Sequence, residues 1–136
     1  MTDSVRHACS FLFVPATQPE RLPKALASGA DLVIADWEDA VAPADKERAR
    51  TALADALTAL PAPQRARLLV RINSEATPWF AADLQALAQL TAQGLAGAVV
   101  PKAERAQTLQ AVAQASGLHA ALAPLVEAGH SAEDIF

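Results

Sequence analysis

The sequence predicts an α/β fold in which the strands of a parallel sheet alternate with amphipathic helices. Short apolar runs rich in Val, Leu and Ile recur along the chain, and longer alanine-rich segments with apolar residues at helical spacing separate them. Strands that are apolar at nearly every position are typical of a parallel sheet buried on both faces. The expected order of elements is therefore βαβαβαβαβ.

Five apolar runs are expected to form the strands. They are FLFV (11–14), DLVIAD (31–36), RLLVRI (67–72), GAVVP (97–101) and HAALAPLV (119–126). Each run has the length of a strand and is too short to span a membrane. Together they predict a section of parallel sheet with five strands.

Two helices are expected before the third strand. Thr17 followed by Glu20 predicts a capping box at the start of the first helix, which ends at Gly29. Pro43 begins the second helix, whose apolar positions keep helical spacing up to Pro61. The charged residues within 45–50 predict that the first turns of this second helix present a solvated face.

Two more helices are expected after the third strand. Thr77 and Pro78 repeat the cap-then-proline start, and Gly94 follows the apolar positions of this helix. The last helix is expected from about residue 103 to Gly117. Each helix would then connect two parallel strands, as a βαβ unit requires.

Composition limits the class of protein. The chain has 136 residues, the size of one domain covering residues 1–136, and 52% of them are hydrophobic. The formal net charge is -4 and Lys and Arg are scattered, which argues against a nucleic acid partner. The sequence has no signal-like or membrane-spanning run, so a cytoplasmic protein is expected. The single Cys9 excludes an internal disulfide and a zinc site built on thiolates.

Two architectures fit the alternating pattern of strands and helices. One is a doubly wound open sheet, and the other is the first part of a (β/α)₈ barrel, which needs about 250 residues in full. The glycine-rich nucleotide fingerprints G-x-G-x-x-G and G-x-x-x-x-G-K-[ST] are both missing from the sequence. Their absence favours the (β/α)₈ barrel, of which this chain would cover about the first five strands.

Charged residues follow consecutive predicted strands at the point where each strand ends. These residues are Asp36, Glu38, Asp39, Arg71, Lys102, Glu104 and Glu127. In both architectures active sites gather at the carboxyl ends of parallel strands. A shared pocket is therefore expected, in which Arg71, Lys102 or a divalent cation offsets the repulsion among the carboxylates. Oxygen ligands without thiolates suit Mg²⁺ or Mn²⁺.

A family resemblance rests on six short motifs that occur in order along the chain. They are LFVP (12–15), D-x-E-D-A-V (36–41), LVRIN (69–73), TPW (77–79), VVPKAE (99–104) and LVE (125–127). With these motifs the chain resembles the citrate lyase beta subunit and its relatives in the HpcH/HpaI aldolase group. The resemblance covers nearly the whole chain.

The resemblance implies a (β/α)₈ barrel enzyme that makes or breaks a carbon–carbon bond next to a thioester. The expected reaction is that of a divalent-metal-dependent lyase acting on a citryl, malyl or citramalyl thioester, with an oxo acid such as oxaloacetate or glyoxylate released or used. The metal would be Mg²⁺ or Mn²⁺, and the acyl group would be carried on coenzyme A or on an acyl carrier protein. A homo-oligomer, or completion by a further chain, is expected.

The resemblance also assigns roles to residues. Arg71 matches the arginine that binds the carboxylate and carbonyl of the oxo acid, a task suited to the guanidinium fork. Glu127 matches the first metal-binding carboxylate. Glu38 and Asp39 match the acidic pair that orders metal-bound water and Arg71. Arg71, Glu38 and Asp39 are therefore the expected catalytic residues, and Glu127 is the expected metal ligand.

Two further residues are expected to line the substrate pocket. Asp36 begins the acidic motif, and Lys102 belongs to a strand-end pair with Glu104. Without the resemblance, a structural ion pair of Arg71 with Asp36 or Glu38 at the strand ends would be favoured, and the resemblance favours the oxo-acid role instead.

The sequence departs from the family pattern at several positions. Cys9 stands at an arginine position, Ala16 replaces a glycine after the first strand, and Ala128 follows Glu127 where the family has Thr. About three strands of the barrel and the second metal-binding aspartate are not in this sequence. An alternative function is therefore a non-catalytic truncated paralogue or subunit that retains the fold and serves assembly.

Overall fold

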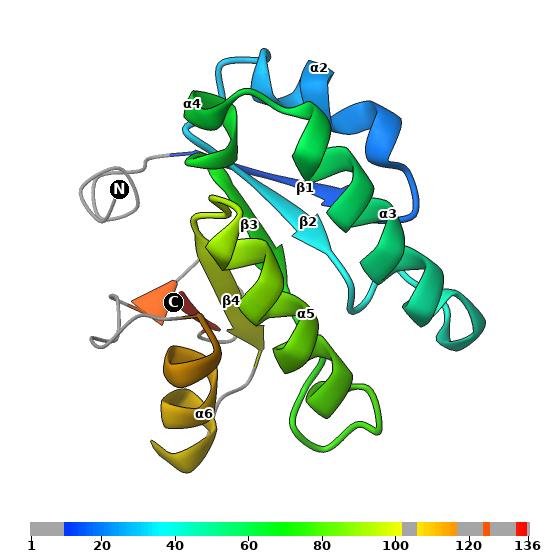
Figure 1. The fold of residues 1–136 in the computed structure, drawn as a ribbon, viewed down its shortest axis with the longest axis vertical. Coiled ribbons are helices and arrows are strands. Elements are labelled where there is room, and N and C mark those ends of the chain that lie inside the picture. The colour runs from blue at the N-terminus through cyan, green and yellow to red at the C-terminus, as the bar shows by residue number, and fades with distance from the viewer. Residues whose placement is uncertain (1–9, 102–105, 117–123, 126–132, 136) are drawn as a thin grey trace.

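A parallel sheet of four strands forms the centre of the described part of the chain. The computed structural model describes residues 10–101, 106–116, 124–125 and 133–135. The parallel strands are β1 (Phe11–Pro15), β2 (Leu32–Asp36), β3 (Leu68–Arg71) and β4 (Gly97–Pro101). Each strand pairs with the next one along the chain (Figure 1). The predicted alternation of parallel strands and helices is confirmed for this part.

Helices separate these strands along the chain, and the last helix follows β4. They are the 3₁₀ turn η1 (Pro19–Arg21) with α2 (Leu22–Leu26), the turn η2 (Pro43–Asp45) with α3 (Lys46–Ala59), α4 (Ala62–Arg65), α5 (Phe80–Ala92) and α6 (Ala106–Ser116). Pro43 begins its helical segment as predicted. In the described ranges, no helix combines the length and apolar character that a membrane crossing would need.

The prediction that Thr17 and Thr77 cap their helices is wrong. The residue before η1 is Gln18 and the residue before α5 is Trp79, and neither makes a side-chain capping hydrogen bond. The hydroxyl of Thr77 instead donates to the carbonyl of Ser74 at 2.7 Å and closes a turn ahead of α5. The helix end at Gly94 is confirmed, because this residue has φ +106°, a conformation that glycine adopts without a Cβ clash.

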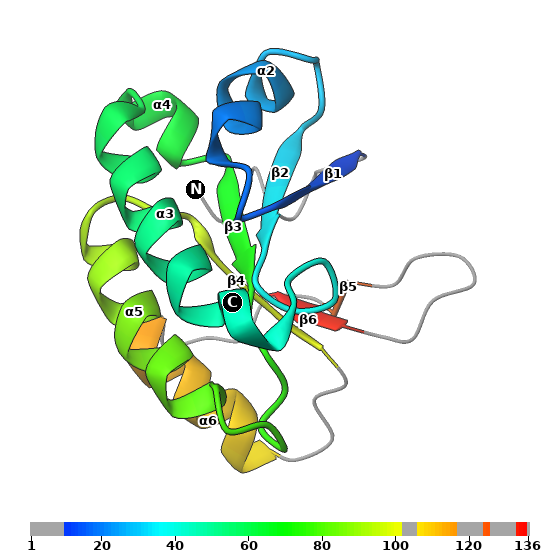
Figure 2. The same ribbon diagram turned by 90° about the vertical axis from the view of Figure 1, so that its right-hand side faces the viewer.

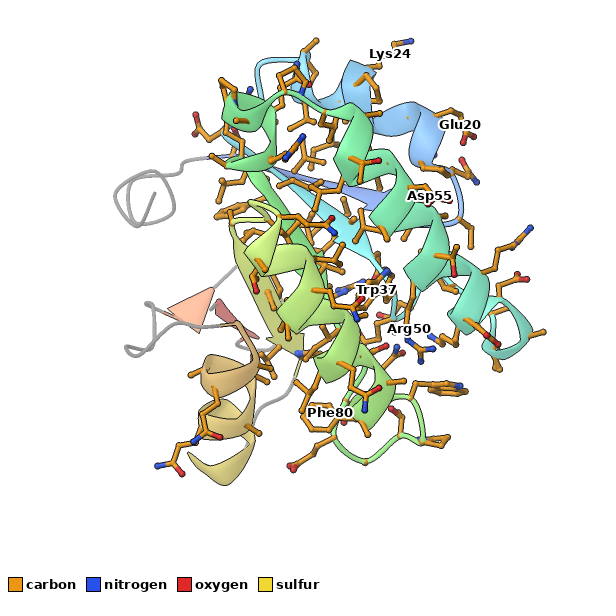
Figure 3. All side chains as sticks on the ribbon, in the orientation of Figure 1. Glu20, Lys24, Trp37, Arg50, Asp55 and Phe80 are labelled. Atoms are coloured by element: carbon orange, nitrogen blue, oxygen red, sulfur yellow. The ribbon has the colours of Figure 1, made fainter. Side chains whose placement is uncertain are left out.

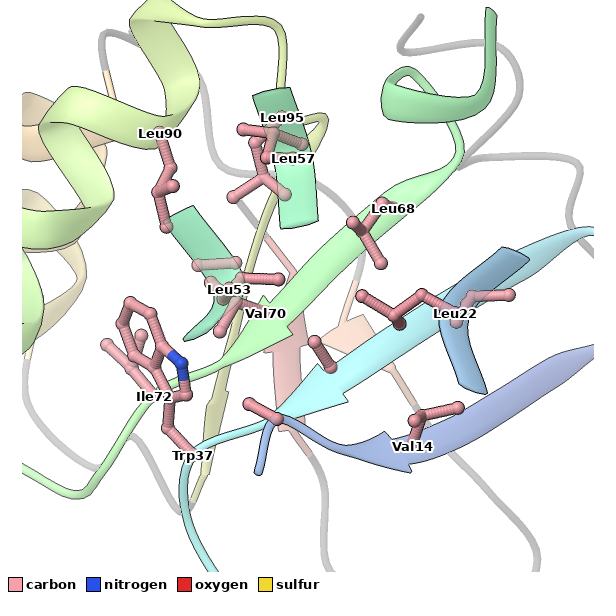
Figure 4. Close-up of a cluster of buried hydrophobic side chains, with 14 of the residues drawn as sticks. Val14, Leu22, Trp37, Leu53, Leu57, Leu68, Val70, Ile72, Leu90 and Leu95 are labelled. Atoms are coloured by element: carbon pink, nitrogen blue, oxygen red, sulfur yellow. The ribbon is translucent and has the colours of Figure 1, made fainter. Parts of the chain in front are cut away.

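Buried side chains form two clusters on opposite faces of the sheet. The helix-side cluster joins the helices to one face of the strands, and its members include Leu22, Leu53, Leu87, Val112, Val14, Val33, Leu68, Val70 and Ala98. Figure 4 shows Leu22 and Leu53 next to strand residues of this cluster. The inner-face cluster consists of Leu32, Ile34, Leu69, Ala96 and Val99, with Phe11 and Phe13 packed against it.

All the helices that contribute buried residues do so on the helix side of the sheet. Residues of α2, α3, α5 and α6 belong to the helix-side cluster, and the inner-face cluster contains strand residues and the adjoining Ala96. Figure 2 shows α3, α5 and α6 along the same side of β3 and β4. A doubly wound sheet carries helices on both faces, whereas a barrel carries them on its outer face. This arrangement confirms the barrel-type architecture for the described part.

The fifth predicted strand differs from expectation. Its described part is β5 (Pro124–Leu125), which pairs antiparallel with β6 (Glu133–Ile135), and β6 pairs antiparallel with β4. The prediction of a parallel strand beside β4 is therefore wrong for these two residues, and the rest of 119–126 lies outside the described residues. Pro124 has no N–H to donate, which limits strand pairing at this point, and β6 pairs with the edge groups of β4 instead.

The packing of α3 in the helix-side cluster predicts how much a truncated side chain there destabilises the fold. Leu53 is fully buried, so Leu53→Ala should lower the free energy of unfolding by about 2–5 kcal/mol. Urea denaturation followed by circular dichroism measures the change. Leu12→Ala is the matched control, because Leu12 is 39% exposed on β1. Equal losses for the two variants would contradict the assignment of the core.

Candidate active site at the carboxyl ends of the strands

Asp36 and Arg71 are neighbours at the carboxyl ends of β2 and β3. The two residues are partners in the register of the parallel pair. Side chains alternate along a strand, so Asp36 shares its face with Leu32 and Ile34. Arg71 shares its face with Leu69 for the same reason. Because those leucines and Ile34 belong to the inner-face cluster, both charged side chains face away from the helices.

A bidentate ion pair joins these two side chains. Nε of Arg71 donates to Oδ1 of Asp36 at 3.0 Å, and Nη2 donates to Oδ2 at 2.7 Å. The side chains are 14% and 2% exposed, respectively. The fork geometry and the low exposure make this contact stronger than an ordinary surface ion pair. Arg71 thus provides the positive charge that the acidic end of β2 requires.

Asp36 also shapes the main chain that follows it. Its Oδ1 accepts a hydrogen bond from the N–H of Glu38 at 2.8 Å, and its Oδ2 accepts one from the N–H of Ala40 at 3.1 Å. Together with Arg71, these donors occupy both carboxylate oxygens. The turn after β2 is therefore built around one buried carboxylate, and this turn carries Glu38 and Asp39.

Glu38 and Asp39 lie further from the guanidinium than Asp36 does. Oε1 of Glu38 is 3.5 Å from Nε of Arg71, and Oδ2 of Asp39 is 3.9 Å from Nη2. The side chain of Glu38 is 20% exposed and that of Asp39 is 81% exposed. The structure therefore brings all three acids of the motif to Arg71, with the buried one in closest contact and the exposed one at the rim.

Phe13 completes the surroundings of Arg71, and sequence reasoning missed its role. The guanidinium carbon of Arg71 lies 4.7 Å from the centre of the Phe13 ring, which is close enough for a cation–π contact. Phe13 lies on the inner face of β1. Phe13 belongs to the LFVP motif, and this membership is the sequence signal that could have identified it.

Lys46 supports the same turn from the helix side. Its Nζ donates to the carbonyls of Trp37 and Glu38, at 2.8 Å each, and lies 5.0 Å from the centre of the Trp79 ring. The residue is buried, so the prediction of a solvated Lys46 is wrong. The amino end of α3 packs against the turn after β2. This tertiary contact buries the side chain of Lys46, which the local sequence pattern alone would place in solvent.

Burial changes the acid–base behaviour of Lys46. Desolvation lowers the pKa of its ammonium below the ordinary value of 10.5, and the nearby carboxylates of Asp36, Asp83, Glu38 and Asp39 partly oppose this effect. The main-chain carbonyls that it contacts favour the charged form. Lys46 is therefore a buried cation that hydrogen-bonds to main-chain carbonyls and whose charged form the nearby carboxylates favour.

A second buried network fixes the segment after β3. Nε of Arg50 donates to Oδ1 of Asp83 at 2.7 Å, while Oδ2 of Asp83 accepts from the N–H and the side-chain amide of Asn73 at 2.8 and 2.7 Å. Asp83 is fully buried. Figure 3 shows Arg50 between α3 and α5, with Trp37 beyond the tip of β2. Sequence reasoning missed Asp83, whose one signal is its place in the first turn of a helix.

The remaining predicted site residues lie outside the described residues. These are Lys102, Glu104 and Glu127. Within the described ranges, no group of three or more His, Cys, Asp or Glu side chains is arranged to hold a metal ion. Glu38 and Asp39 provide the carboxylate oxygens that Mg²⁺ prefers, and they lie on the side of the sheet that a barrel encloses. The donor chemistry of these two side chains is therefore compatible with Mg²⁺.

Comparison with known proteins identifies the family. The family model for HpcH/HpaI aldolase/citrate lyase matches residues 9–122. A (3S)-malyl-CoA thioesterase of Cereibacter sphaeroides is 39% identical over 104 residues, which are 76% of this chain and 35% of the relative. A citrate lyase subunit beta-like protein of Mycobacterium tuberculosis is 48% identical over 96 residues, 71% of this chain and 32% of the relative.

A solved structure agrees with these sequence matches. The citrate lyase beta subunit of M. tuberculosis, complexed with oxaloacetate and magnesium, superposes with a TM-score of 0.62 and 44% sequence identity. The match covers 79% of this chain and 44% of that structure. The chain spans about a third of the length of the curated relatives that it matches. With the family model matching most of its length, the chain belongs to the HpcH/HpaI aldolase/citrate lyase family.

Proposed function

We propose that this chain is the amino-terminal part of a divalent-metal-dependent carbon–carbon lyase of the citrate lyase beta subunit type. Residues 1–136 would form the first part of a single (β/α)₈ barrel domain. The substrate would be a 3-hydroxyacyl thioester such as a citryl, malyl or citramalyl thioester, on coenzyme A or an acyl carrier protein. The observation that carries the proposal is the guanidinium of Arg71 on the inner face of the sheet, oriented by Asp36 beside Glu38 and Asp39.

The proposed role of Arg71 is to bind the oxo acid. A guanidinium is a planar fork of N–H donors, a geometry that matches a substrate carboxylate and carbonyl. Asp36 fixes the plane of the fork, and the Phe13 ring supports its face. A preoriented cation costs little reorganisation when negative charge develops on the oxygen of the oxo acid.

The cleavage itself requires no external redox partner. The hydroxyl proton of the 3-hydroxyacyl thioester leaves, its oxygen forms the carbonyl of the oxo acid, and the bond between C2 and C3 breaks. The electron pair of that bond forms the thioester enolate, which takes up a proton to give the acyl thioester. A bound Mg²⁺ would supply Lewis-acid polarisation of the oxo acid. Glu127 would hold it, Glu38 and Asp39 would order its water and Arg71, and Lys102 would line the pocket.

The relative named as a malyl-CoA thioesterase supports a second candidate reaction at the same site. Hydrolysis would release malate and a free thiol, whereas lyase cleavage would release glyoxylate and leave the thioester intact. Incubation of the natural full-length protein with malyl-CoA and Mg²⁺ distinguishes the two. Glyoxylate with acetyl-CoA supports the lyase, malate with free coenzyme A supports the thioesterase, and no turnover of any family thioester supports the non-catalytic assembly role.

The role of Arg71 predicts a loss of oxo-acid affinity in Arg71→Lys. Lysine cannot present the bidentate fork, so oxaloacetate should bind about tenfold to a hundredfold more weakly in the presence of Mg²⁺. Isothermal titration calorimetry measures the affinity. Arg48→Lys is the matched control, because Arg48 is 67% exposed on α3. Unchanged binding in Arg71→Lys would remove Arg71 from the substrate site.

The role of Glu127 predicts a loss of metal affinity in Glu127→Gln. An amide lacks the negative charge that favours Mg²⁺ among oxygen ligands, so Mg²⁺ should bind at least about tenfold more weakly. Calorimetric titration with MgCl₂ checks this expectation. Glu20→Gln, at an exposed position of η1, serves as the control. If Glu127→Gln kept the affinity of the parent protein, Glu127 would be a structural residue.

A further inference from the structure

We propose that Lys46 is a positioning residue that sets the placement of Glu38 and Asp39 relative to Arg71. It would act through the main chain of the turn after β2, from the side of the sheet opposite the substrate. The role is distinct from binding or catalysis, because the ammonium contacts the turn and is separated from the inner face by it. The inference rests on the proposed function of the Arg71 site.

The contacts of Lys46 are specific to the acidic segment. Its two hydrogen bonds reach the consecutive carbonyls of Trp37 and Glu38. These carbonyls belong to the two peptide units that join Trp37 to Glu38 and Glu38 to Asp39. The orientation of these peptide units determines where the side chains of Glu38 and Asp39 project. A lysine that binds both carbonyls therefore restricts the two acids without contacting the guanidinium of Arg71.

The opposite side of the turn is already fixed by other groups. The N–H groups of Glu38 and Ala40 donate to Asp36, and the N–H of Trp37 donates to the carbonyl of Arg71 at 3.0 Å. These bonds engage three N–H donors of the turn, whereas Lys46 donates to two of its carbonyls, and the carbonyl of Glu38 also accepts from the N–H of Val41 at 3.2 Å. The turn is thus held between Asp36 on the inner face and Lys46 on the helix side.

A cation is suited to this position because of the charge on the turn. Asp36, Glu38 and Asp39 place three carboxylates within four residues, and Lys46 lies buried beneath them. Its hydrogen bonds go to main-chain oxygens rather than to carboxylates, so its charge offsets the repulsion among the acids without neutralising one of them by direct pairing. The Trp79 ring lies over the ammonium and adds a cation–π contact.

The same helix face anchors the segment on the other side of Arg71. Arg50 lies one turn after Lys46 on α3, and it holds Asp83, which in turn holds Asn73 two residues beyond Arg71. Nη2 of Arg50 also donates to the carbonyl of Trp79 at 3.4 Å. One face of α3 therefore contacts both strand-end segments of the site, and Lys46 is its link to the acidic one.

The test compares Lys46→Met with Arg48→Met, which removes an exposed charge from the same helix. The first measurement is amide hydrogen exchange of the full chain. Lys46→Met should accelerate exchange at Glu38 and Ala40 at least tenfold more than at the core amides of Leu53 and Leu57, and Arg48→Met should change neither set. Equal acceleration at all four amides would overturn the proposal, because that pattern is a general loss of stability.

The second measurement is the affinity for oxaloacetate with Mg²⁺. Lys46→Met should weaken it about tenfold while the fold is retained, and unchanged affinity would overturn the proposal. If the parent protein binds no oxo acid, the proposed function fails, and the exchange measurement alone decides the role of Lys46. If Lys46→Met does not fold, Lys46→Gln takes its place, since an amide keeps N–H donors but lacks the charge. Hydrogen exchange and oxaloacetate affinity are then measured for Lys46→Gln, with the same expected and contradicting results.

Discussion

The ion pair between Asp36 and Arg71 is the interaction on which the candidate site depends. The register of β2 and β3 makes the two residues partners, and strand alternation turns both toward the inner face. Burying a carboxylate at a strand end is unfavourable unless a cation and hydrogen-bond donors accompany it. Arg71 and two main-chain N–H groups meet that requirement. The positions of Glu38 and Asp39 then follow from the turn that Asp36 closes.

The division of the sheet into two faces gives the site its supports. The helices pack on one face, and the inner face carries Phe13, Asp36 and Arg71. The segments after β2 and β3 therefore have the side chains of the candidate site on one side and α3 on the other. From α3, Lys46 reaches the first segment by direct hydrogen bonds, and Arg50 reaches the second through Asp83, so helix packing and site geometry are linked.

The sequence predicted the parallel strands and the meeting of Asp36 with Arg71, because both follow from local patterns. Apolar runs define strands, and charged residues at their ends must gather at one edge of a parallel sheet. Lys46 and Asp83 were not predictable in this way. Their burial depends on which helix packs against which turn, and a charged residue near a helix start is ordinarily solvated. The fifth strand was misplaced because an apolar run does not specify its pairing partner.

A double-mutant cycle between Asp36 and Arg71 tests the central claim most directly. The free energies of unfolding of Asp36→Asn, Arg71→Gln and the double variant are measured by urea denaturation and compared with that of the parent protein. The account predicts that the double variant loses less than the sum of the two single losses, with a coupling of about 1–3 kcal/mol. Losses that add to within about 0.5 kcal/mol would contradict it, because Asp36 and Arg71 would then contribute independently.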